Sequence, residues 1–392
     1  MTIHTLTVFG TRPEAIKMAP LIQQLALIPS VQNKICITGQ HQHMLNSVLE
    51  LFDIQADFNL EVMTDNQDLT GLTVKLLVGM QTIFSQYRPD LVIVHGDTTT
   101  TFIASLAAFY QQIPVAHVEA GLRTHHIYSP WPEEVNRHVT GVLAAIHFAP
   151  TERAKANLLR EGVAPDRIHV TGNTVIDALY RMNQRIDTDS VLKESLQHRF
   201  SFLNSNRRMI LVTGHRRENF GEGFERICQA LSQIARRFPQ VDIVYPVHLN
   251  PNVQEPVNRL LGAERNIHLI PPVDYLPFVY LMKSAFLILT DSGGIQEEAP
   301  ALGIPVLVMR DITERPEAVA AGGVKMVGSA VDKIVEQVEM LLMDELVYEA
   351  MSQPVSPYGD GNAAGKIAAL IAAMSFSLSP VKSARVAEEV IC

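Results

Sequence analysis

One pattern recurs along the chain and limits the folds open to it: a short β-branched run, a polar or glycine-containing loop, then a helical segment. The pattern begins with TLTVF, GTRPEA and IKMAPLIQQLA, and repeats in LVIV, HGDTTT and TFIASLAAFYQQ. It restarts in the second half with MILVT and GHRREN, and reaches AFLILT followed by DSGGIQEEAPALG. Strands that alternate with helices form parallel sheets with helices on both faces. Two such series predict an α/β protein with two doubly wound, Rossmann-type domains.

The chain length and the restart of the pattern predict the domain boundaries. A chain of 392 residues is too long for one ordinary core, so about two domains are expected. We expect an N-terminal domain over residues 1–171 and a second domain over 172–361, because the first series ends near HVTGNTVIDAL. A last helix is expected over 362–374, and the tail 375–392 is expected to be disordered. Pro20 is expected to kink or split the first helix.

The composition restricts the class of partner. With 47% hydrophobic and 19% charged residues, the chain is globular, and no apolar run approaches the ~18 residues that cross a membrane. The net charge of −9 argues against a nucleic-acid partner. A small anionic ligand is still possible, because a local cationic cluster acts within a screening length of ~8–10 Å.

The cysteines and the first residues indicate a cytoplasmic protein. Cys36, Cys228 and Cys392 have no metal-binding spacing, and the first two lie in apolar or helical stretches, so we expect buried thiols in a reducing compartment. The opening MTIHTLTVFG leads directly into a strand without a basic region or cleavage site, so no signal peptide is expected.

Unusual polar residues fall just after the predicted strands, where open α/β sheets bind their ligands. If the two domains face each other edge to edge, these residues line one cleft between them. They are Arg12, Lys17, Asp97, Glu119, Arg123, His215, residues 292–298 and Arg315.

The stretch LTDSGGIQEEAP, residues 289–300, places Ser-Gly-Gly between a strand and a helix. Free backbone N–H groups and the helix dipole make such a turn an anion site, although it can also be only a tight turn. A nucleotide carries phosphates and, one sugar away, a ribose diol whose hydroxyls a carboxylate can accept. We therefore expect Ser292, Gly293 and Gly294 to hold phosphates and Glu298 to hold ribose. The alternative is that Glu297 and Glu298 only complement the helix dipole from its first turn.

Cationic groups on other loops fit the same ligand. In GTRPEAIK, Arg12 could grip a phosphate bidentately and Lys17 could add a second positive charge, although a lysine on a first turn is usually just solvated. His215 heads the GHRREN loop directly after a strand, where a lone histidine is more often structural.

Acidic residues form a second group. HGDTTTT, HVEAGLRT and PEEVNRH supply carboxylates just past buried strands, which is costly unless they are paired or take part in chemistry. For Asp97 the alternative is a helix N-cap. The residues in question are Asp97, Glu119, Glu133, Glu134, Arg137 and His138. No cluster has metal-binding spacing, and GEGFER lacks the third glycine of a dinucleotide fingerprint, so neither a metal nor NAD is expected.

These motifs together resemble a known family. From about residue 3 to residue 374, and in one register, the chain is similar to the non-hydrolysing UDP-N-acetylglucosamine 2-epimerases. The resemblance implies the two-domain GT-B architecture, with the last helix crossing back to the first domain. It also implies interconversion of UDP-GlcNAc and UDP-ManNAc without a cofactor, a homodimer, and a role in supplying mannosamine units for surface polysaccharides. The segments that carry it include FGTRPEAIKMAPL, TGQH, VHGDTTTT, HVEAGLRT, SPWPEEVNRH, TGNTVIDAL, VTGHRRENFG, YPVHLNPNV, DSGGIQEEAP, RDITERPEAV and PYGDG.

The resemblance assigns roles position by position. It implies that Glu298 binds ribose and that Phe278 lies beside uracil. The diphosphate side is implied to comprise Arg12, Lys17, His215, Ser292, Gly293, Gly294 and Arg315. The groups implied to be essential for the chemistry are Asp97, Glu119, Glu133 and His215, with Arg137 supporting them. Where the family has QHREMLDQ this chain has QHQHMLNS, so it departs at Gln42, His43, Asn46 and Ser47, and activation by a second UDP-GlcNAc is left open.

The chemistry explains why such groups are needed. The C2 proton of an N-acetylhexosamine is not adjacent to a carbonyl, so its direct removal faces a prohibitive barrier. Expelling UDP from C1 first and then losing that proton gives 2-acetamidoglucal, to which UDP can re-add after protonation from the opposite face. Cationic groups stabilise the departing diphosphate, and carboxylates stabilise the oxocarbenium ion and move protons. The alternatives are a hydrolysing 2-epimerase, a GT-B glycosyltransferase and a sugar-nucleotide-binding regulator without turnover.

Overall fold

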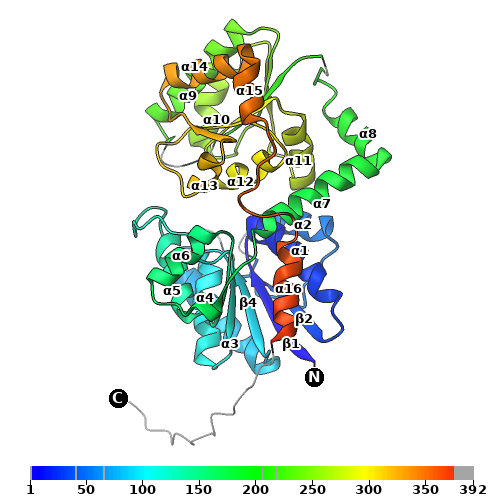
Figure 1. The fold of residues 1–392 in the computed structure, drawn as a ribbon, viewed down its shortest axis with the longest axis vertical. Coiled ribbons are helices and arrows are strands. Elements are labelled where there is room, and N and C mark those ends of the chain that lie inside the picture. Colours follow the sequence, from blue (N-terminus) through cyan, green and yellow to red (C-terminus); the bar gives the residue numbers. More distant parts are fainter. Residues whose placement is uncertain are drawn as a thin grey trace, which may run out of the picture.

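The computed structural model describes residues 2–39, 42–64, 67–204, 206–214, 216 and 219–374. Two parallel sheets, each with helices packed against it, form two domains that face each other, as Figure 1 shows. The predicted fold class, an α/β protein with two doubly wound domains in a GT-B-like arrangement, is confirmed. His215 and the tail 375–392 lie outside the described residues.

The first sheet has seven parallel strands in the order β3-β2-β1-β4-β5-β6-β7. Its strands are β1 (Ile3–Phe9), β2 (Val31–Ile37), β3 (Phe58–Asn59), β4 (Leu91–His95), β5 (Val115–Val118), β6 (Ile146–Ala149) and β7 (Ile168–Val170). Its helices are α1 (Arg12–Ala26), α2 (Gln42–Leu51), α3 (Leu69–Gln86), α4 (Thr99–Tyr110), α5 (Glu133–Leu143), α6 (Glu152–Arg160) and the short 3₁₀ helix η1 (Pro165–Arg167). Helices α3, α4 and α5 pack side by side on one face, and α1 packs with α2 on the other.

The second sheet has six parallel strands in the order β10-β9-β8-β11-β12-β13. Its strands are β8 (Met209–Thr213), β9 (Asp242–Pro246), β10 (Ile267–Ile270), β11 (Leu287–Thr290), β12 (Val306–Val308) and β13 (Val324–Met326). The helices are α8 (Ser190–Arg199), α9 (Glu222–Arg237), α10 (Pro251–Leu261), α11 (Tyr275–Ser284), α12 (Gly293–Ala301), α13 (Pro316–Ala320), α14 (Val331–Met343) and α15 (Glu345–Met351). Figure 1 shows α11, α12 and α13 on the side of this domain that faces the first.

The strand order predicts where a ligand would bind. In the first sheet it reverses between β1 and β4, and in the second between β8 and β11. Crevices at such switch points, outside the carboxyl ends of the strands, are where doubly wound folds bind ligands. Arg12 begins α1 just after β1, and the loops after β4 and β11 carry Asp97 and Ser292.

Two helices tie the halves together. Helix α7 (Thr174–Thr188) packs against α1 of the first domain and against α11 and α12 of the second, and the final helix α16 (Ala363–Ala373) packs on α1. One apolar core therefore runs through both halves and includes Leu21, Val175, Leu276 and Ile367. The domain limits at 171 and 361 stay predictions.

Several local expectations can be compared with the structure. Helix α1 continues through Pro20, so of the expected kink or split the split is wrong, and the kink stays a prediction. A capping box between Thr11 and Glu14 and a buried apolar face offset the hydrogen bond that proline cannot make. Cys36 and Cys228 are buried, as expected, and burial raises the pKa of each thiol to about 12. Across the described part of the chain, every helix is too short or too polar to cross a bilayer.

Candidate active site

A cavity of about 580 Å³ lies between the two domains and collects the predicted site residues. All residues to which the resemblance assigns a role line this cavity, apart from His215, which lies outside the described residues. They are Arg12, Lys17, Asp97, Glu119, Glu133, Arg137, Phe278, Ser292, Gly293, Gly294, Glu298 and Arg315. Arg123, which also follows a strand, does not line it, because its guanidinium donates two hydrogen bonds of 2.7 Å to Glu161.

The N-terminus of α12 lines the cavity. Ser292 is the N-cap, its side chain makes no capping bond, and Gly293 begins the helix. The first N–H groups of a helix have no carbonyl partner within the helix, so they are available to an anion. A Cβ atom on Gly293 would meet Oε1 of Glu314 at 3.0 Å and Cζ of Arg315 at 3.2 Å, so glycine suits this close packing.

The two glutamates of α12 have different surroundings. Neither is in the first turn, so the expectation that they merely complement the helix dipole is wrong. Glu298 lines the cavity and accepts a 2.7 Å hydrogen bond from the Tyr275 hydroxyl. Burial raises the pKa of Glu298 to about 7, against the opposing effect of that hydrogen bond. Glu297 is also buried but contacts charged groups of both domains.

Arg12 joins the first βα loop to the second domain. Its Nη2 donates a 3.0 Å hydrogen bond to the Val273 carbonyl, just before α11. Phe278 lies on α11 and lines the same cavity. A cation, an aromatic ring and the Glu298 carboxylate therefore surround one space.

Lys17 is the centre of a buried ionic cluster. Its ammonium group donates to Oε2 of Glu119 and lies 3.7 Å from Oε2 of Glu297. Arg315 donates from Nε to Oε1 of Glu297 at 2.8 Å and pairs with Glu314, also at 2.8 Å. Lys17 was predicted on the diphosphate side, and in this structure its charge is shared by two buried carboxylates.

Glu119 occupies a strained position at the end of β5. Its φ of 60° is in the left-handed region, which costs a non-glycine residue on the order of 1–2 kcal/mol. Burial would raise the pKa of its carboxyl, but the charges of Lys17 and Arg315 outweigh burial and hold that pKa below its usual value. A carboxylate held in the ionised state suits stabilisation of positive charge better than proton transfer.

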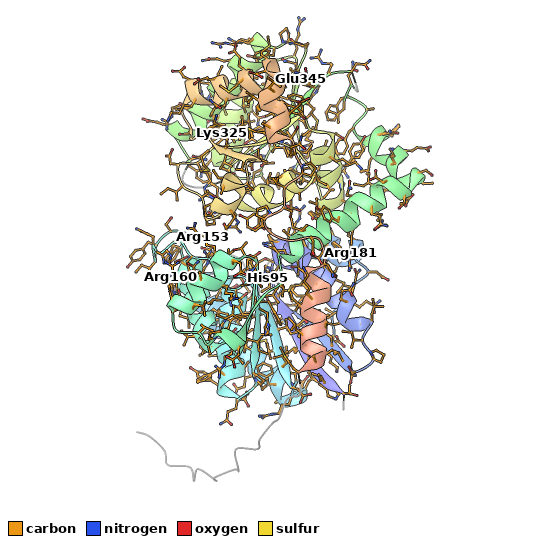
Figure 2. The ribbon with its side chains drawn as sticks, in the orientation of Figure 1. His95, Arg153, Arg160, Arg181, Lys325 and Glu345 are labelled. Atoms are coloured by element: carbon orange, nitrogen blue, oxygen red, sulfur yellow. The ribbon has the colours of Figure 1, made fainter. Side chains whose placement is uncertain are left out.

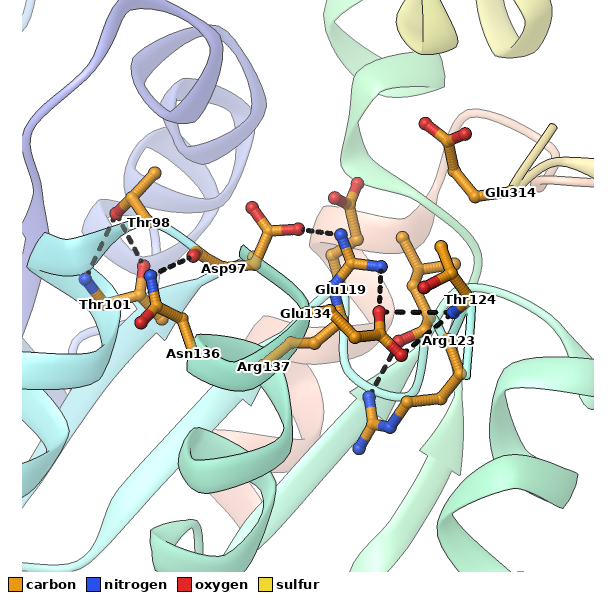
Figure 3. A network of polar contacts seen from close by, with 12 residues as sticks. Asp97, Thr98, Thr101, Glu119, Arg123, Thr124, Glu134, Asn136, Arg137 and Glu314 are labelled. Atoms are coloured by element: carbon orange, nitrogen blue, oxygen red, sulfur yellow. Dashed lines mark hydrogen bonds and ion pairs between the residues drawn. The ribbon is translucent and has the colours of Figure 1, made fainter. Parts of the chain in front are cut away.

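Asp97 and Arg137 also line the cavity, and they form an ion pair with each other (Figure 3). Nη2 of Arg137 lies 2.5 Å from Oδ2 of Asp97, and its Nη1 donates to Glu134 at 3.1 Å. The expectation that Asp97 is the N-cap of α4 is wrong, because Thr98 takes that position and accepts from the Thr101 N–H at 3.1 Å. The Asp97 side chain is thereby available to the cavity.

Glu133 begins α5 and differs from its acidic neighbours. Its Oε2 is buried and has no hydrogen-bond partner among the described residues. The next residue, Glu134, accepts the backbone N–H groups of Thr124 and His125 and therefore has a structural role. A buried carboxylate oxygen without a donor indicates a position where a ligand can supply one.

Sequence reasoning missed several lining residues, among them His95, Glu14 and Tyr275. His95 ends β4, at the end of the first domain that faces the second (Figure 2). Both of its ring nitrogens are buried without a hydrogen-bond partner among the described residues, and Nε2 is 3.7 Å from Oε2 of Glu119. Burial lowers the pKa of His95 to about 4, so the ring is neutral. The sequence feature that could have identified His95 is its place directly before Gly-Asp at the end of a strand. For Glu14 the feature was a capping box, and for Tyr275 there was none.

The fold and site together define a class: a two-domain α/β protein whose cavity is lined by a helix N-terminus of the second domain and by carboxylates of the first. A sequence model described as UDP-N-acetylglucosamine 2-epimerase matches residues 23–372. UDP-N-acetylglucosamine 2-epimerases of Yersinia pestis and Escherichia coli strain K12 are 60% and 59% identical over 365 residues, which is 93% of this chain and 97% of each relative. The chain belongs to the UDP-N-acetylglucosamine 2-epimerase family.

A solved structure agrees with the sequence comparison. The crystal structure of UDP-GlcNAc 2-epimerase from Neisseria meningitidis bound to UDP-GlcNAc is similar with a TM-score of 0.91 and 52% identity. The match covers 94% of this chain and 99% of that one. Where this chain departs from the family pattern, Asn46 and Ser47 lie on α2, and the side chains of Gln42 and His43 are outside the described part.

Proposed function

We propose that the protein reversibly epimerises C2 of UDP-N-acetylglucosamine to give UDP-N-acetylmannosamine. The observation that carries the proposal is the shared cavity. It joins the free N-terminus of α12 and the Glu298 carboxylate on one side to Asp97, Glu119 and Glu133 on the other. Family membership and the similarity to a protein crystallised with UDP-GlcNAc support the same substrate.

The cavity suggests how UDP would bind. The diphosphate would lie at the N-terminus of α12 and would be held by Ser292, Gly293 and Gly294, with Arg12 nearby. Glu298 would accept the ribose hydroxyls, and Phe278 would lie beside uracil. His215 keeps its sequence-based assignment to the diphosphate. The sugar would then extend toward the carboxylates of the first domain.

The proposed reaction proceeds by elimination and re-addition. The C1–O bond breaks with its electron pair moving to the departing diphosphate, the C2 proton passes to a base, and the C1=C2 double bond of 2-acetamidoglucal forms. Protonation of C2 from the opposite face and attack of UDP oxygen on C1 complete the inversion. Every atom and electron balances within substrate and protein, so the step uses no cofactor.

The carboxylates divide these tasks by their surroundings. Glu119, kept ionised by Lys17, would stabilise positive charge on the ring. Glu133 has a buried oxygen without a donor and is suited to proton transfer on one face of C2. Asp97, steadied by Arg137 at 2.5 Å, would serve the other face. UDP must stay bound through the intermediate, so closure of the two domains belongs to the mechanism.

The biological setting follows from the product. UDP-ManNAc supplies mannosamine units for surface polysaccharide, and we propose this role in the cytoplasm. We also propose a homodimer, because large apolar side chains are exposed on the adjoining helices α3, α4 and α5. Examples are Val74, Val78, Phe109, Tyr110 and Val142.

One experiment tests the reaction and separates the alternatives. Purified protein is incubated with UDP-GlcNAc in D2O, and products are followed by NMR. We expect UDP-ManNAc with deuterium at C2 in each epimerised molecule, while UDP-GlcNAc persists at equilibrium. Free ManNAc with UDP would indicate the hydrolysing enzyme, consumption only with an added acceptor would indicate a glycosyltransferase, and no turnover would indicate a regulator. Protium retained at C2 would overturn the elimination route.

A further inference from the structure

Asn173 lies where the chain passes from the first domain to the second. It is the N-cap of α7, the helix that follows the last strand of the first sheet. Its backbone N–H donates to the Tyr358 carbonyl at 2.5 Å, where the chain returns from the second domain. A Cβ atom on Gly172 would meet that carbonyl oxygen at 3.0 Å and Cα of Gly359 at 3.1 Å, so the two crossings pass in close contact.

The amide of Asn173 connects one carboxylate from each domain. Its Nδ2 donates to Oε2 of Glu119 at 2.6 Å and to Oε2 of Glu297 at 3.0 Å. All three side chains are buried. Two buried carboxylates repel each other unless shared donors hold them, and this amide and Lys17 contact both.

The rest of the Asn173 side chain fixes the direction of the amide. Its Oδ1 accepts the Val175 N–H at 3.1 Å as the cap of α7. With the oxygen held there, the NH2 group must point to the carboxylates. Asparagine is suited to this position because its side chain combines a cap acceptor with two donors.

The Asn173 amide links helix α12 to the Glu119 carboxylate on the other side of the domain boundary. Glu297 and Glu298 are adjacent on α12, and Glu298 lines the cavity while Glu297 faces Asn173 and Arg315. On the other side, the donors reach Oε2 of Glu119, and Oε1 receives no hydrogen bond from the described residues. The oxygen that is left for the substrate therefore has its position set by groups that also hold the nucleotide-binding helix.

We infer that Asn173 is a positioning residue, which together with Glu297 aligns the Glu119 carboxylate with the bound nucleotide across the domain boundary. This inference rests on the proposed epimerase function. Asn173 does not touch the substrate, and it acts by holding Oε2 of Glu119 at a fixed place relative to α12. Loss of its amide would lower turnover more than it lowers UDP affinity.

Two substitutions separate the amide from the helix cap. Asn173→Ser keeps a capping oxygen and removes both donors without adding charge, and Asn173→Asp keeps the cap but places a third carboxylate beside Glu119 and Glu297. For Asn173→Ser we expect kcat to fall about tenfold or more, as for loss of a hydrogen bond to a charged group, with KM and the UDP dissociation constant changed less than about threefold. For Asn173→Asp we expect a larger loss at pH 8 that recovers partly toward pH 6, because protonation relieves the added repulsion. If Asn173→Asp does not fold, Asn173→Ser and the cycle below still decide the question.

Controls make the result specific. Asn204→Asp is the matched variant, because Oδ1 of the exposed Asn204 also accepts the N–H two residues on, at 2.9 Å, and has no carboxylate partner among the described residues. Its kcat and pH profile should equal those of the wild type. In a double-mutant cycle, Glu297→Gln should lower kcat, and adding Asn173→Ser should cost less than it does alone.

The outcomes are distinguishable from failure of the proposed function. If the wild type does not interconvert the two sugar nucleotides, the proposed function is wrong and this inference goes with it. If the wild type epimerises but Asn173→Ser keeps full kcat, the inference alone is wrong. Parallel losses of kcat, UDP affinity and thermal stability, or an additive cycle, would also overturn it, because they would show a merely structural role.

Discussion

The Tyr275 hydroxyl donates a 2.7 Å hydrogen bond to Oε1 of Glu298, and both side chains are buried at the edge of the cavity. The phenol leaves the other carboxylate oxygen for a ligand. Burial raises the pKa of this carboxyl to about 7, so its charge changes within the range of ordinary assays. Nucleotide binding should therefore depend on the ionisation of Glu298.

The first prediction concerns the pH dependence of UDP binding. The ionised form of Glu298 accepts ribose hydroxyls better, so UDP affinity should fall as the pH drops from 8 to 6 and the carboxylate takes up a proton. Glu298→Ala should weaken binding at pH 8 by ~1–3 kcal/mol, the usual cost of losing a charge-assisted contact. Titration calorimetry at several pH values measures both effects.

Glu298→Gln is the control for that measurement. It keeps the shape of the side chain but cannot titrate, so any pH dependence left in it belongs to other groups, such as the phosphates of UDP. If the glutamine variant follows the same pH curve as the wild type, with the same affinity at pH 8, Glu298 does not bind the ribose.

A second prediction concerns ligand-linked stability. UDP should raise the melting temperature, because a ligand at a hundred times its dissociation constant stabilises the folded state by about 2.7 kcal/mol. NAD and EDTA should leave the melting temperature unchanged, since the sequence has no dinucleotide fingerprint and the described residues hold no metal-type cluster. Thermal scans with each additive test this. Activity lost in EDTA and restored by a divalent ion would show that a metal takes part.

Much of the fold could be predicted because it depends on local patterns. Apolar runs followed by polar loops and helical periodicity identified both sheets, and the ends of their strands identified the cavity. Residues such as Asp97 and Ser292 were found because they follow strands, where a doubly wound fold places its ligand.

What could not be predicted depends on contacts between distant segments. Tyr275 meets Glu298 only when α11 packs beside α12, and Lys17 meets Glu297 only when the domains come together. The alternative that Asp97 caps α4 could not be excluded from sequence, because Asp97 and Thr98 are both good caps and sequence does not fix the helix start to one residue.

A third prediction concerns stability at acid pH. His95, His117 and His147 are buried on neighbouring strands, and burial lowers their pKa values to about 4, 3 and 4. Below pH 6.5 these histidines take up protons in the unfolded chain, whereas in the folded chain they stay neutral down to a lower pH. The contribution of the neutral histidines to the free energy of unfolding is therefore fully present above about pH 6.5. It is lost as the pH falls toward 4, by on the order of 1 kcal/mol per pH unit for each histidine.

His147→Gln tests that slope away from the cavity. Between pH 6 and pH 5, the free energy of unfolding from urea denaturation should fall less steeply than in the wild type, by about 1 kcal/mol per pH unit. His198→Gln changes an exposed histidine of α8 and should leave the slope as it is. Equal slopes in wild type and His147→Gln would contradict the prediction.

The last prediction divides the work among the carboxylates. Asp97→Asn, Glu119→Gln and Glu133→Gln keep side-chain shape and remove one charge each, and each should slow epimerisation by ~10²–10⁴. A group that serves one face of C2 is the base for one epimer and the acid for the other. Glu133→Gln should therefore eliminate UDP from only one of the two sugar nucleotides and then stall, releasing UDP and 2-acetamidoglucal.

Glu119→Gln should behave differently because positive charge develops on the ring from either epimer. With both UDP-GlcNAc and UDP-ManNAc it should slow C1–O cleavage, and glucal should accumulate from neither. Each variant is incubated with each sugar nucleotide, glucal is measured by NMR, and UDP affinity by calorimetry checks that the nucleotide side is intact. If Glu119→Gln released glucal from only one epimer, and Glu133→Gln slowed C1–O cleavage of both epimers equally, the two roles would be reversed. Glu119 would then transfer the proton and Glu133 would stabilise the charge. Such a result would show that the pairing with Lys17 orients a proton-transferring group.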